Sequence, residues 1–321
     1  ELSDFALEII RSKKSLLVVC NTKREAKELF ENLQAEVNNA VPMYHLSASM
    51  CAKHRKMTVE SMKKDLGLPD PKQIVCVATQ VIEAGVDISF NCVIRLQAGM
   101  DSVVQAAGRC NRNGENKLES VYIVNLLGEK LHRLKEIRTA KSATESLLQE
   151  VKIKKHYTSL NSDSAISFYY KKLYSMMNKG EQDFLVPNLH KSLYGLLNQH
   201  DVADGYFLAQ QLKTAGKYFN VFDNNTVEMI VPYGKGQDVI SELNSEKAMY
   251  NLAYAEEAIK QATGYTVTCY QYQIEKLKEG NKDAAVIYND YFGIYILNDS
   301  AYYDDKLGLN LDAIGGEGVF Y

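Results

Sequence analysis

The stretch Ser15-Leu16-Leu17-Val18-Val19-Cys20 is an unbroken apolar run, and Asn21-Thr22-Lys23 follows it directly. Such a run is typical of a strand buried on both faces of a parallel sheet, and the polar residues after it can cap a helix. The free amides at a helix start carry a partial positive charge, which favours a phosphate group. The stretch therefore predicts an α/β fold with ligand-binding residues where the strand ends.

The same alternation of strand and helix continues over the first third of the chain. Further apolar strands are expected at 43–46, 73–78, 93–96 and 120–126, and helices at 23–36, 53–66 and 101–108. Alternating strands and helices imply a doubly wound parallel sheet, and such sheets bind ligands beyond the carboxyl ends of their strands. Residues at those ends are the first candidates for function.

The rest of the chain has a different texture. A long charged helix is expected at 129–153, with further helices at 165–177, 188–199 and 245–262. Strands are expected at 265–274 and 285–297, and 219–233 reads as two strands joined by a turn at 223–225. We therefore expect domain boundaries at 1–128, 129–200 and 201–321. All tyrosines but two follow residue 150, which fits half-buried strands and helices or a stacking and docking surface.

Composition narrows the function classes. The net charge is -3, so any contact with nucleic acid must come from local patches or backbone amides. No apolar run approaches the roughly 18 residues that a membrane span needs. The six cysteines form no C-x-x-C pair and the histidines are scattered, which predicts no metal site and reduced thiols in a cytoplasmic protein.

A pair of arginines stands in the segment Gln105-Ala106-Ala107-Gly108-Arg109-Cys110-Asn111-Arg112. Residues three apart on a helix or turn are neighbours, so both guanidinium groups can point the same way. The planar guanidinium fork matches phosphate oxygens and can stabilise the charge that develops in phosphoryl transfer. An isolated R-x-x-R would more often be a solvated basic turn, so the segments upstream decide between the two interpretations.

Two upstream segments carry polar residues at strand ends. In the segment 78–88, ATQVIEAGVDI, Gly85 would allow close approach of a ligand, Asp87 could accept hydrogen bonds from ribose hydroxyls, and Thr79 could donate to a phosphate. The alternative is a plain turn between strands with a capping aspartate. In the segment 46–55, LSASMCAKHR, hydroxyls and a basic pair suit a nucleic-acid backbone.

In their order and spacing, these segments resemble the second RecA-like domain of a superfamily-two helicase. Residues 15–23 match motif IV of that family, 79–87 motif V and 105–112 motif VI. The residue patterns of segments 46–55, 77–88 and 101–114 resemble those of the CRISPR-associated helicase-nuclease of type I systems. Lys53 departs from them, because that family often has proline at this position. Looser similarity follows at 219–233 and in the terminal segment Tyr303-Asp304-Asp305-Lys306-Leu307-Gly308-Leu309.

The resemblance implies a fold and a set of residue roles. The fold would be a RecA-like parallel sheet with flanking helices, followed by a helical linker and a smaller α+β C-terminal domain. Arg109 and Arg112 would be arginine fingers that reach the γ-phosphate of ATP, with Gln105 also catalytic. ATP would further contact Gly85, Asp87 and Gly108. The residues implied for DNA binding are Asn21, Thr22, Ser47, Ser49, His54, Arg55, Thr79 and Gln80.

The sequence lacks the other half of such an enzyme. It contains no G-x-x-x-x-G-K-[ST] loop, no acidic magnesium motif and no histidine–aspartate nuclease motif. We therefore expect a C-terminal portion, or one piece of a split protein, that is inactive alone. The first helicase domain would hold ATP and Mg²⁺, and Arg109 and Arg112 of this chain would face solvent.

The resemblance also implies a function and partners. The function would be ATP-dependent translocation on single-stranded DNA, coupled to a nuclease that degrades invading DNA. The implied partners are single-stranded DNA, a CRISPR RNA-guided surveillance complex, and the N-terminal nuclease and first helicase domains. A protein inhibitor is a further partner class, and no membrane is involved. Two alternatives stay open, namely another superfamily-two translocase of restriction or repair, and a non-catalytic docking module.

Overall fold

The computed structural model describes residues 2–37, 41–68, 73–83, 85–132, 134–154, 157, 159–177, 185–186, 189–198, 212–218, 226–279 and 285–311. Contacts divide the chain into two compact units, 1–129 with 225–321 and 130–224. The three-part division expected from sequence stays a prediction. No described helix is long and apolar enough to cross a membrane.

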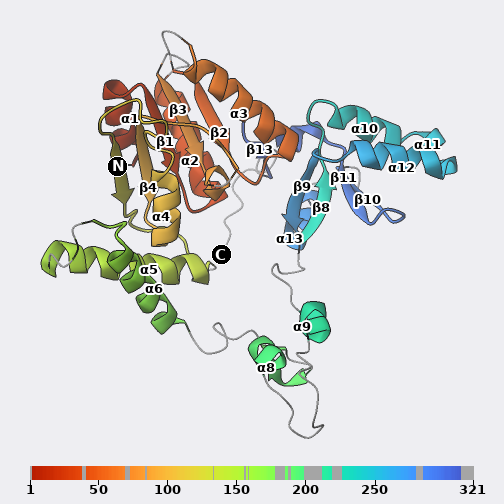
Figure 1. Cartoon of the computed structure of the whole chain (residues 1–321). Coiled ribbons are helices and arrows are strands. Elements are labelled where there is room, and N and C mark those ends of the chain that lie inside the picture. Colours follow the sequence, from red (N-terminus) through yellow and green to blue (C-terminus); the bar gives the residue numbers. More distant parts are fainter. Residues whose placement is uncertain are drawn as a thin grey trace, which may run out of the picture. The chain divides into compact units, whose positions relative to one another are not determined.

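A five-stranded sheet forms the core of residues 1–129 (Figure 1). All its strand pairs are parallel, as the sequence predicts. The strand order is β2 (Met43–Leu46), β3 (Ile74–Ala78), β1 (Ser15–Val19), β4 (Cys92–Leu96) and β5 (Ser120–Val124). Every residue of β1, β3 and β4 is buried, which explains why these strands read as unbroken apolar runs.

Helices cover both faces of this sheet. Alternate strand residues face two separate apolar clusters, with Leu16 and Val18 in one and Leu17 and Val19 in the other. The first cluster includes residues of α1 (Leu2–Ser12) and α2 (Lys23–Val37), and the second includes residues of α3 (Ala52–Leu66) and α4 (Met100–Ala107). The predicted α/β architecture is therefore confirmed.

The C-terminal part of the first unit is α+β, with a mixed sheet in the order β10-β11-β8-β9. Its elements are β8 (Thr226–Ile230), α10 (Gly236–Leu243), α11 (Glu246–Tyr250), α12 (Leu252–Gln261), β9 (Thr266–Tyr270), α13 (Gln271–Glu279), β10 (Val286–Asn289) and β11 (Ile294–Leu297). A short helix, η5 (Ser300–Tyr302), precedes the hairpin of β12 (Tyr303–Asp304) and β13 (Gly308–Leu309).

The prediction of a strand at 265–274 needs correction, and another prediction in this region falls outside the described residues. The strand expected at 265–274 ends at Tyr270, where the side chain of Gln273 accepts a hydrogen bond from the Tyr270 amide and α13 begins. Helix α10 was not expected. The turn at 223–225 and the strand before it lie outside the described residues.

The second unit consists mainly of helices. Its elements are α5 (Lys135–Gln149), a π-helical turn (Glu150–Lys154), α6 (Asp163–Met176), β6 (Leu185–Val186), β7 (Lys191–Ser192), α8 (Leu193–Asn198) and α9 (Leu212–Tyr218). The helix expected from 129 therefore begins six residues later, after a turn in which Gly128 adopts a φ of 80°. Ser162 caps α6 by accepting a hydrogen bond from the Ala165 amide.

Candidate active site

The residues predicted to bind ligands follow neighbouring strands at one edge of the sheet. The Cys20 amide donates to the Ala78 carbonyl at 2.8 Å, and the Thr79 amide donates to the Leu46 carbonyl at 2.9 Å. These bonds align the ends of β1, β2 and β3, so the segments that follow them start side by side. This edge is the ligand-binding edge of a parallel sheet.

The two polar residues between β1 and α2, Asn21 and Thr22, have different roles. Thr22 and Glu25 form a reciprocal cap, in which each side chain accepts a hydrogen bond from the other residue's amide. Asn21 instead turns inward and is buried, where its side chain contacts Arg95, the Gln97 carbonyl and Glu129. Only Thr22 therefore caps α2, whereas Asn21 belongs to a buried network.

The segment after β2 has an ordered backbone. Ser47 is buried, and its hydroxyl accepts a hydrogen bond from the Ser49 amide at 3.2 Å. The guanidinium of Arg55 donates to the carbonyl of Met50. Ser49 and Arg55 are partly exposed, so their positions are compatible with a ligand at the surface.

His54 occupies a different environment from that expected of a DNA ligand. Its ring is buried and stacks on the ring of Tyr233 with the centroids 4.1 Å apart. One ring nitrogen lies 3.0 Å from the Tyr303 hydroxyl and the other lies 2.8 Å from the Asp305 carbonyl. Both nitrogens are thus occupied inside the protein, which corrects the prediction that the His54 side chain is presented to DNA.

The segment after β3 begins with the short helix η1 (Gln80–Ile82). Thr79 is buried and Gln80 partly exposed. Gly85 has a φ of 72°, but a Cβ added there would lie within 4 Å of no described atom other than those of its chain neighbours. A left-handed backbone, rather than close packing within this chain, is therefore what requires glycine at this position.

Arg112 and Asp87 join the two strongest sequence motifs. The Arg112 Nε donates to Asp87 Oδ1 at 2.9 Å, and both side chains are exposed. The Arg112 amide also donates to the Ser89 hydroxyl at 2.9 Å. Since an exposed ion pair contributes only about 0–1 kcal/mol, a phosphate group could displace Asp87 from Arg112 at little cost.

Arg109 is buried, with 7% of its surface exposed, which corrects the expectation that both arginines face solvent. Its Nη2 donates to the Glu83 carbonyl at 2.6 Å. Its Nε–H is buried with no hydrogen-bond partner among the described residues. Burial, followed by the nearby positive charge of Arg112, lowers the pKa of Arg109. Such an unsatisfied donor on a charged group favours an anionic ligand.

Gln105 and Gly108 lie close to the two arginines in sequence, but they differ in their structural role. Gln105 is exposed on α4, and Gly108 ends that helix. The Gly108 carbonyl accepts a hydrogen bond from Arg112 Nη1 at 3.3 Å. Gln105 is thus open to a ligand, whereas Gly108 contributes to the placement of Arg112.

The structure adds a buried group of residues that the sequence analysis missed, here called the Arg95 network. Arg95 has no exposed surface and lies 3.3 Å from a carboxylate oxygen of Glu83. Ser102 accepts a hydrogen bond from Arg95 at 2.7 Å and donates to Glu83 at 2.5 Å. Asn21 accepts another from Arg95 at 2.7 Å. A single arginine within an apolar strand was the sequence signal for this network.

The Arg95 network links three motifs to one side chain. Asn21 follows β1, Glu83 follows η1, and Ser102 lies in α4. Because the Glu83 carbonyl also holds the guanidinium of Arg109, a shift of Glu83 would move Arg109 as well. Burial raises the pKa of Glu83 and lowers that of Arg95, as expected where desolvation dominates.

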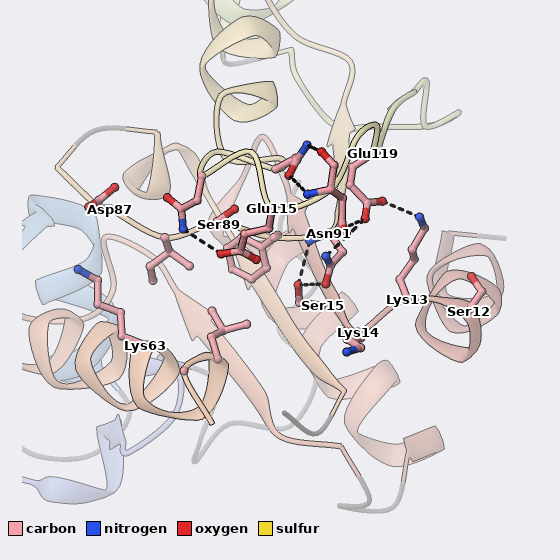
Figure 2. Close-up of a pocket in the computed structure, with 17 residues that line it drawn as sticks. Ser12, Lys13, Lys14, Ser15, Lys63, Asp87, Ser89, Asn91, Glu115 and Glu119 are labelled. Carbon is pink, nitrogen blue, oxygen red and sulfur yellow. Dashed lines mark hydrogen bonds and ion pairs between the residues drawn. The ribbon is translucent and has the colours of Figure 1, made fainter. Parts of the chain in front are cut away.

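A polar hollow of about 590 Å³ lies beside these motifs (Figure 2). Lys13 and Glu119 form an ion pair at 2.6 Å on one side of it, and Asp87 and Lys63 lie on the other. Ser15 and Asn91 are hydrogen-bonded in between. The lining mixes lysines with carboxylates, so its charge alone does not select an anion or a cation.

Comparison with known proteins finds a family that is similar to part of the chain. Residues 12–115 match the family described as CRISPR-associated nuclease/helicase Cas3, C-terminal. This region of the chain is therefore similar in sequence to the C-terminal region of Cas3 proteins. The match contains all four segments that carry the predicted site, from the end of β1 to Arg112.

Individual relatives show the same similarity. The chain is 30% identical over 122 residues to the CRISPR-associated nuclease/helicase Cas3 of Methanothermobacter thermautotrophicus, which covers 37% of this chain and 14% of that protein. The crystal structure of T. fusca Cas3 with ADP has a TM-score of 0.55 at 14% identity, and covers 96% of this chain and 40% of that one. A structure named "CRISPR RNA-guided surveillance complex, pre-nicking" contains a chain with a TM-score of 0.54 at 13% identity, covering 92% of this chain and 38% of that one.

The similarity covers only part of each relative. The chain spans about one seventh of the length of the curated Cas3 relative. The structural likeness is at low identity, so it establishes the fold and not the chemistry. The fold is that of the Cas3 C-terminal region, with a parallel α/β sheet and a smaller mixed-sheet part.

Proposed function

We propose that this chain forms part of an ATP-dependent translocase on single-stranded DNA, coupled to a nuclease that degrades invading DNA in type I CRISPR interference. The observation that carries the proposal is the meeting of Arg109, Arg112 and Asp87 within a region of Cas3 sequence. Neither a restriction or repair translocase nor a docking module is favoured by the Cas3 relatives.

Arg109 and Arg112 would act on the terminal phosphate of ATP in different ways. Arg109 is already oriented by the Glu83 carbonyl and has an unsatisfied Nε–H, so it would bind phosphate with little rearrangement. Arg112 would exchange Asp87 for a phosphate oxygen, which releases Asp87 to accept from a ribose hydroxyl. Gln105 would orient the attacking water. An arginine finger contributes on the order of 10³–10⁵ in rate.

The remaining parts of the ATP site would come from outside this chain. The sequence contains no phosphate-binding loop or acidic magnesium motif, so ATP and Mg²⁺ would be held mainly by a first helicase domain. Gly85 and Gly108 would line the nucleotide from this side. The chain alone is then expected to hydrolyse no ATP, with turnover equal to that of its Arg109→Ala/Arg112→Ala variant.

The edge at the ends of β1–β3 would hold the phosphates of one DNA strand. The candidate contacts that are partly exposed are Thr22, Ser49, Arg55 and Gln80, with Thr79 offering its amide or hydroxyl at the same edge. Ser47 and Asn21 are buried and would support this surface from below. Partners of the whole protein would be single-stranded DNA, its own first helicase and nuclease domains, and a surveillance complex of the kind found with the similar structure.

The finger role is tested by Arg112→Lys in a protein that also contains the first helicase domain. Lysine keeps the charge but loses the planar fork, so we expect ATP turnover to fall at least 10²-fold, roughly 2.7 kcal/mol of transition-state stabilisation. Single-strand DNA binding, measured by fluorescence anisotropy, should change by less than about twofold.

The matched control is Arg24→Lys, an exposed arginine that forms an ion pair with Glu28 within α2. It makes the same chemical change outside the residues proposed to contact ATP and should leave ATP turnover unchanged. Near-normal turnover by Arg112→Lys would remove the finger role, and a parallel loss of DNA binding would point to misfolding rather than lost catalysis.

A further inference from the structure

The terminal segment that resembles Cas3 contacts the predicted DNA-binding loop. We call residues Tyr303–Asn310 the C-terminal hairpin and residues Ser47–Ser49 the serine loop. The Leu309 amide donates to the Ser49 carbonyl at 2.8 Å. Gly308 has a φ of 80°, and a Cβ added there would lie 2.4 Å from the same carbonyl oxygen. Glycine is therefore required here by both conformation and space.

A second contact joins the hairpin to the start of α3. The Tyr303 hydroxyl accepts from the Cys51 amide at 3.0 Å and lies 3.0 Å from His54 Nδ1. His54 Nε2 lies 2.8 Å from the Asp305 carbonyl, which can only accept, so Nε2 carries the proton. Nδ1 then accepts from Tyr303. The result is a neutral chain of hydrogen bonds, consistent with burial lowering the pKa of His54.

The hairpin is itself rigid and anchored. Asp304 Oδ1 accepts from the amides of Lys306 and Leu307 at 2.7 and 2.8 Å, which fixes the turn. Leu307 packs in the apolar cluster shared with α1 and α2. Asn310 accepts from Lys27 of α2 at 2.8 Å. The hairpin therefore holds the serine loop from a platform attached to the core of the sheet.

By comparison, the internal bonds of the serine loop are long. The Ser49 amide lies 3.2 Å from the Ser47 hydroxyl, and the Met50 amide lies 3.2 Å from the Ser47 carbonyl. Fixing a backbone conformation before a ligand arrives removes part of the entropic cost of binding. The bond from Leu309 supplies such a constraint at Ser49.

We propose that the C-terminal hairpin is a positioning device for single-stranded DNA, which fixes the serine loop in its binding conformation through Tyr303 and Gly308. This inference rests on the proposed function, because it assumes that the serine loop contacts DNA. Tyr303 and Gly308 are positioning residues that do not touch DNA themselves. The terminal motif thereby gains a role although it is about 250 residues from the loop in sequence.

The test measures two quantities on this chain and its variants. Binding of a fluorescein-labelled oligothymidine gives the DNA affinity, and hydrogen exchange gives the protection of amides at 47–51. Tyr303→Phe removes one hydroxyl and keeps the ring, and should weaken DNA binding about tenfold, with faster exchange confined to 47–55. Gly308→Ala should weaken DNA binding and speed exchange at 47–55 more strongly, because the added Cβ displaces the Ser49 carbonyl.

Tyr302→Phe is the matched control. Tyr302 is an equally buried neighbour whose hydroxyl has no hydrogen bond to any residue that the structure describes. This variant should bind oligothymidine like the unmodified chain. Unchanged affinity and exchange in Tyr303→Phe would overturn the inference. So would faster exchange spread over β1 and β3, because the hairpin would then be a general stabilising element.

Variants in the DNA site separate this inference from the proposed function. Arg55→Ala and Gln80→Ala should each weaken oligothymidine binding. If neither does, or if the unmodified chain does not bind, the proposed DNA site fails and the hairpin inference fails with it. If both weaken binding while Tyr303→Phe and Gly308→Ala do not, only the hairpin inference is lost.

Discussion

Two buried polar networks hold the two halves of the candidate site, and they differ in charge and in origin. The Arg95 network contains an ion pair and draws all its residues from the Cas3-like region. The second, here called the His54 network, consists of Cys51, His54, Tyr303 and Asp305, and is neutral. The first is local to one domain, whereas the second depends on a hairpin from the end of the chain.

The difference shows how each network can tolerate burial. A buried charge is costly unless its donors are satisfied. Arg95 meets this condition, because it donates to Ser102 and Asn21 and also to the carbonyls of Val19 and Leu96. The His54 network avoids the cost by keeping its histidine neutral. We therefore expect the two networks to respond differently to truncation and to pH.

The largest effect is expected for Arg95→Ala. It leaves Glu83 buried without its cationic partner, and breaking a buried pair in this way costs roughly 3–5 kcal/mol. Urea unfolding of the chain measures the loss. The control is Arg24→Ala, which removes an exposed ion pair and should change stability by less than about 0.5 kcal/mol. A loss below about 1 kcal/mol for Arg95→Ala would mean that Glu83 reaches water, and the contrast between the networks would disappear.

A loss of stability of intermediate size is expected when the pH is lowered. Burial lowers the pKa of His54 and lowers that of neighbouring His45 to about 4, although Asp304 opposes the shift at both. The unfolded chain binds these protons near pH 6.5. Stability is therefore full above about 6.5 and falls as the pH drops towards 4, by roughly 2 kcal/mol at pH 5 from His45 alone.

Glu83 responds in the opposite sense. Burial raises its pKa above the unfolded value, so its contribution to stability is present at low pH and is lost as the pH rises through the folded pKa. Hydrogen exchange at about pH 7 and about pH 5, corrected for intrinsic rates, should show loosening at 43–55 but not at 80–83. His45→Gln should reduce the pH-dependent change in hydrogen exchange at 43–55. Equal loosening at 43–55 and 80–83 would contradict the prediction that His45 and Glu83 respond to pH in opposite directions.

The same contrast explains how much of the molecule was predictable. Strands β1, β3 and β4 could be predicted from unbroken apolar runs, because every residue in them is buried between the two faces of the sheet. The candidate site residues could be predicted because they lie in four short segments. The Arg95 network could also have been predicted, because a buried arginine needs hydrogen-bonding or charged partners.

The His54 network was not predictable by the same reasoning. His54 and Arg55 are adjacent in sequence and read as a basic pair, yet α3 directs one inward and the other towards the surface. The partners of His54 lie about 250 residues away, and no local pattern specifies a contact of that range. The burial of Arg109 was missed for a similar reason, because its partner is the Glu83 carbonyl and backbone groups leave no sequence signal.

The smallest effect is expected where no buried charge is involved. Thr22→Ala removes the hydroxyl that accepts from the Glu25 amide and should cost about 1 kcal/mol in urea unfolding, whereas Thr22→Ser should restore most of it. Asn21, the preceding residue, belongs to the Arg95 network, so Thr22→Ala combined with Arg95→Ala tests whether the cap and the network are separate. If they are, the two losses add to within about 0.5 kcal/mol. A smaller combined loss would mean that the network itself sets the start of α2, and that the charged half of the site extends further than its ion pair.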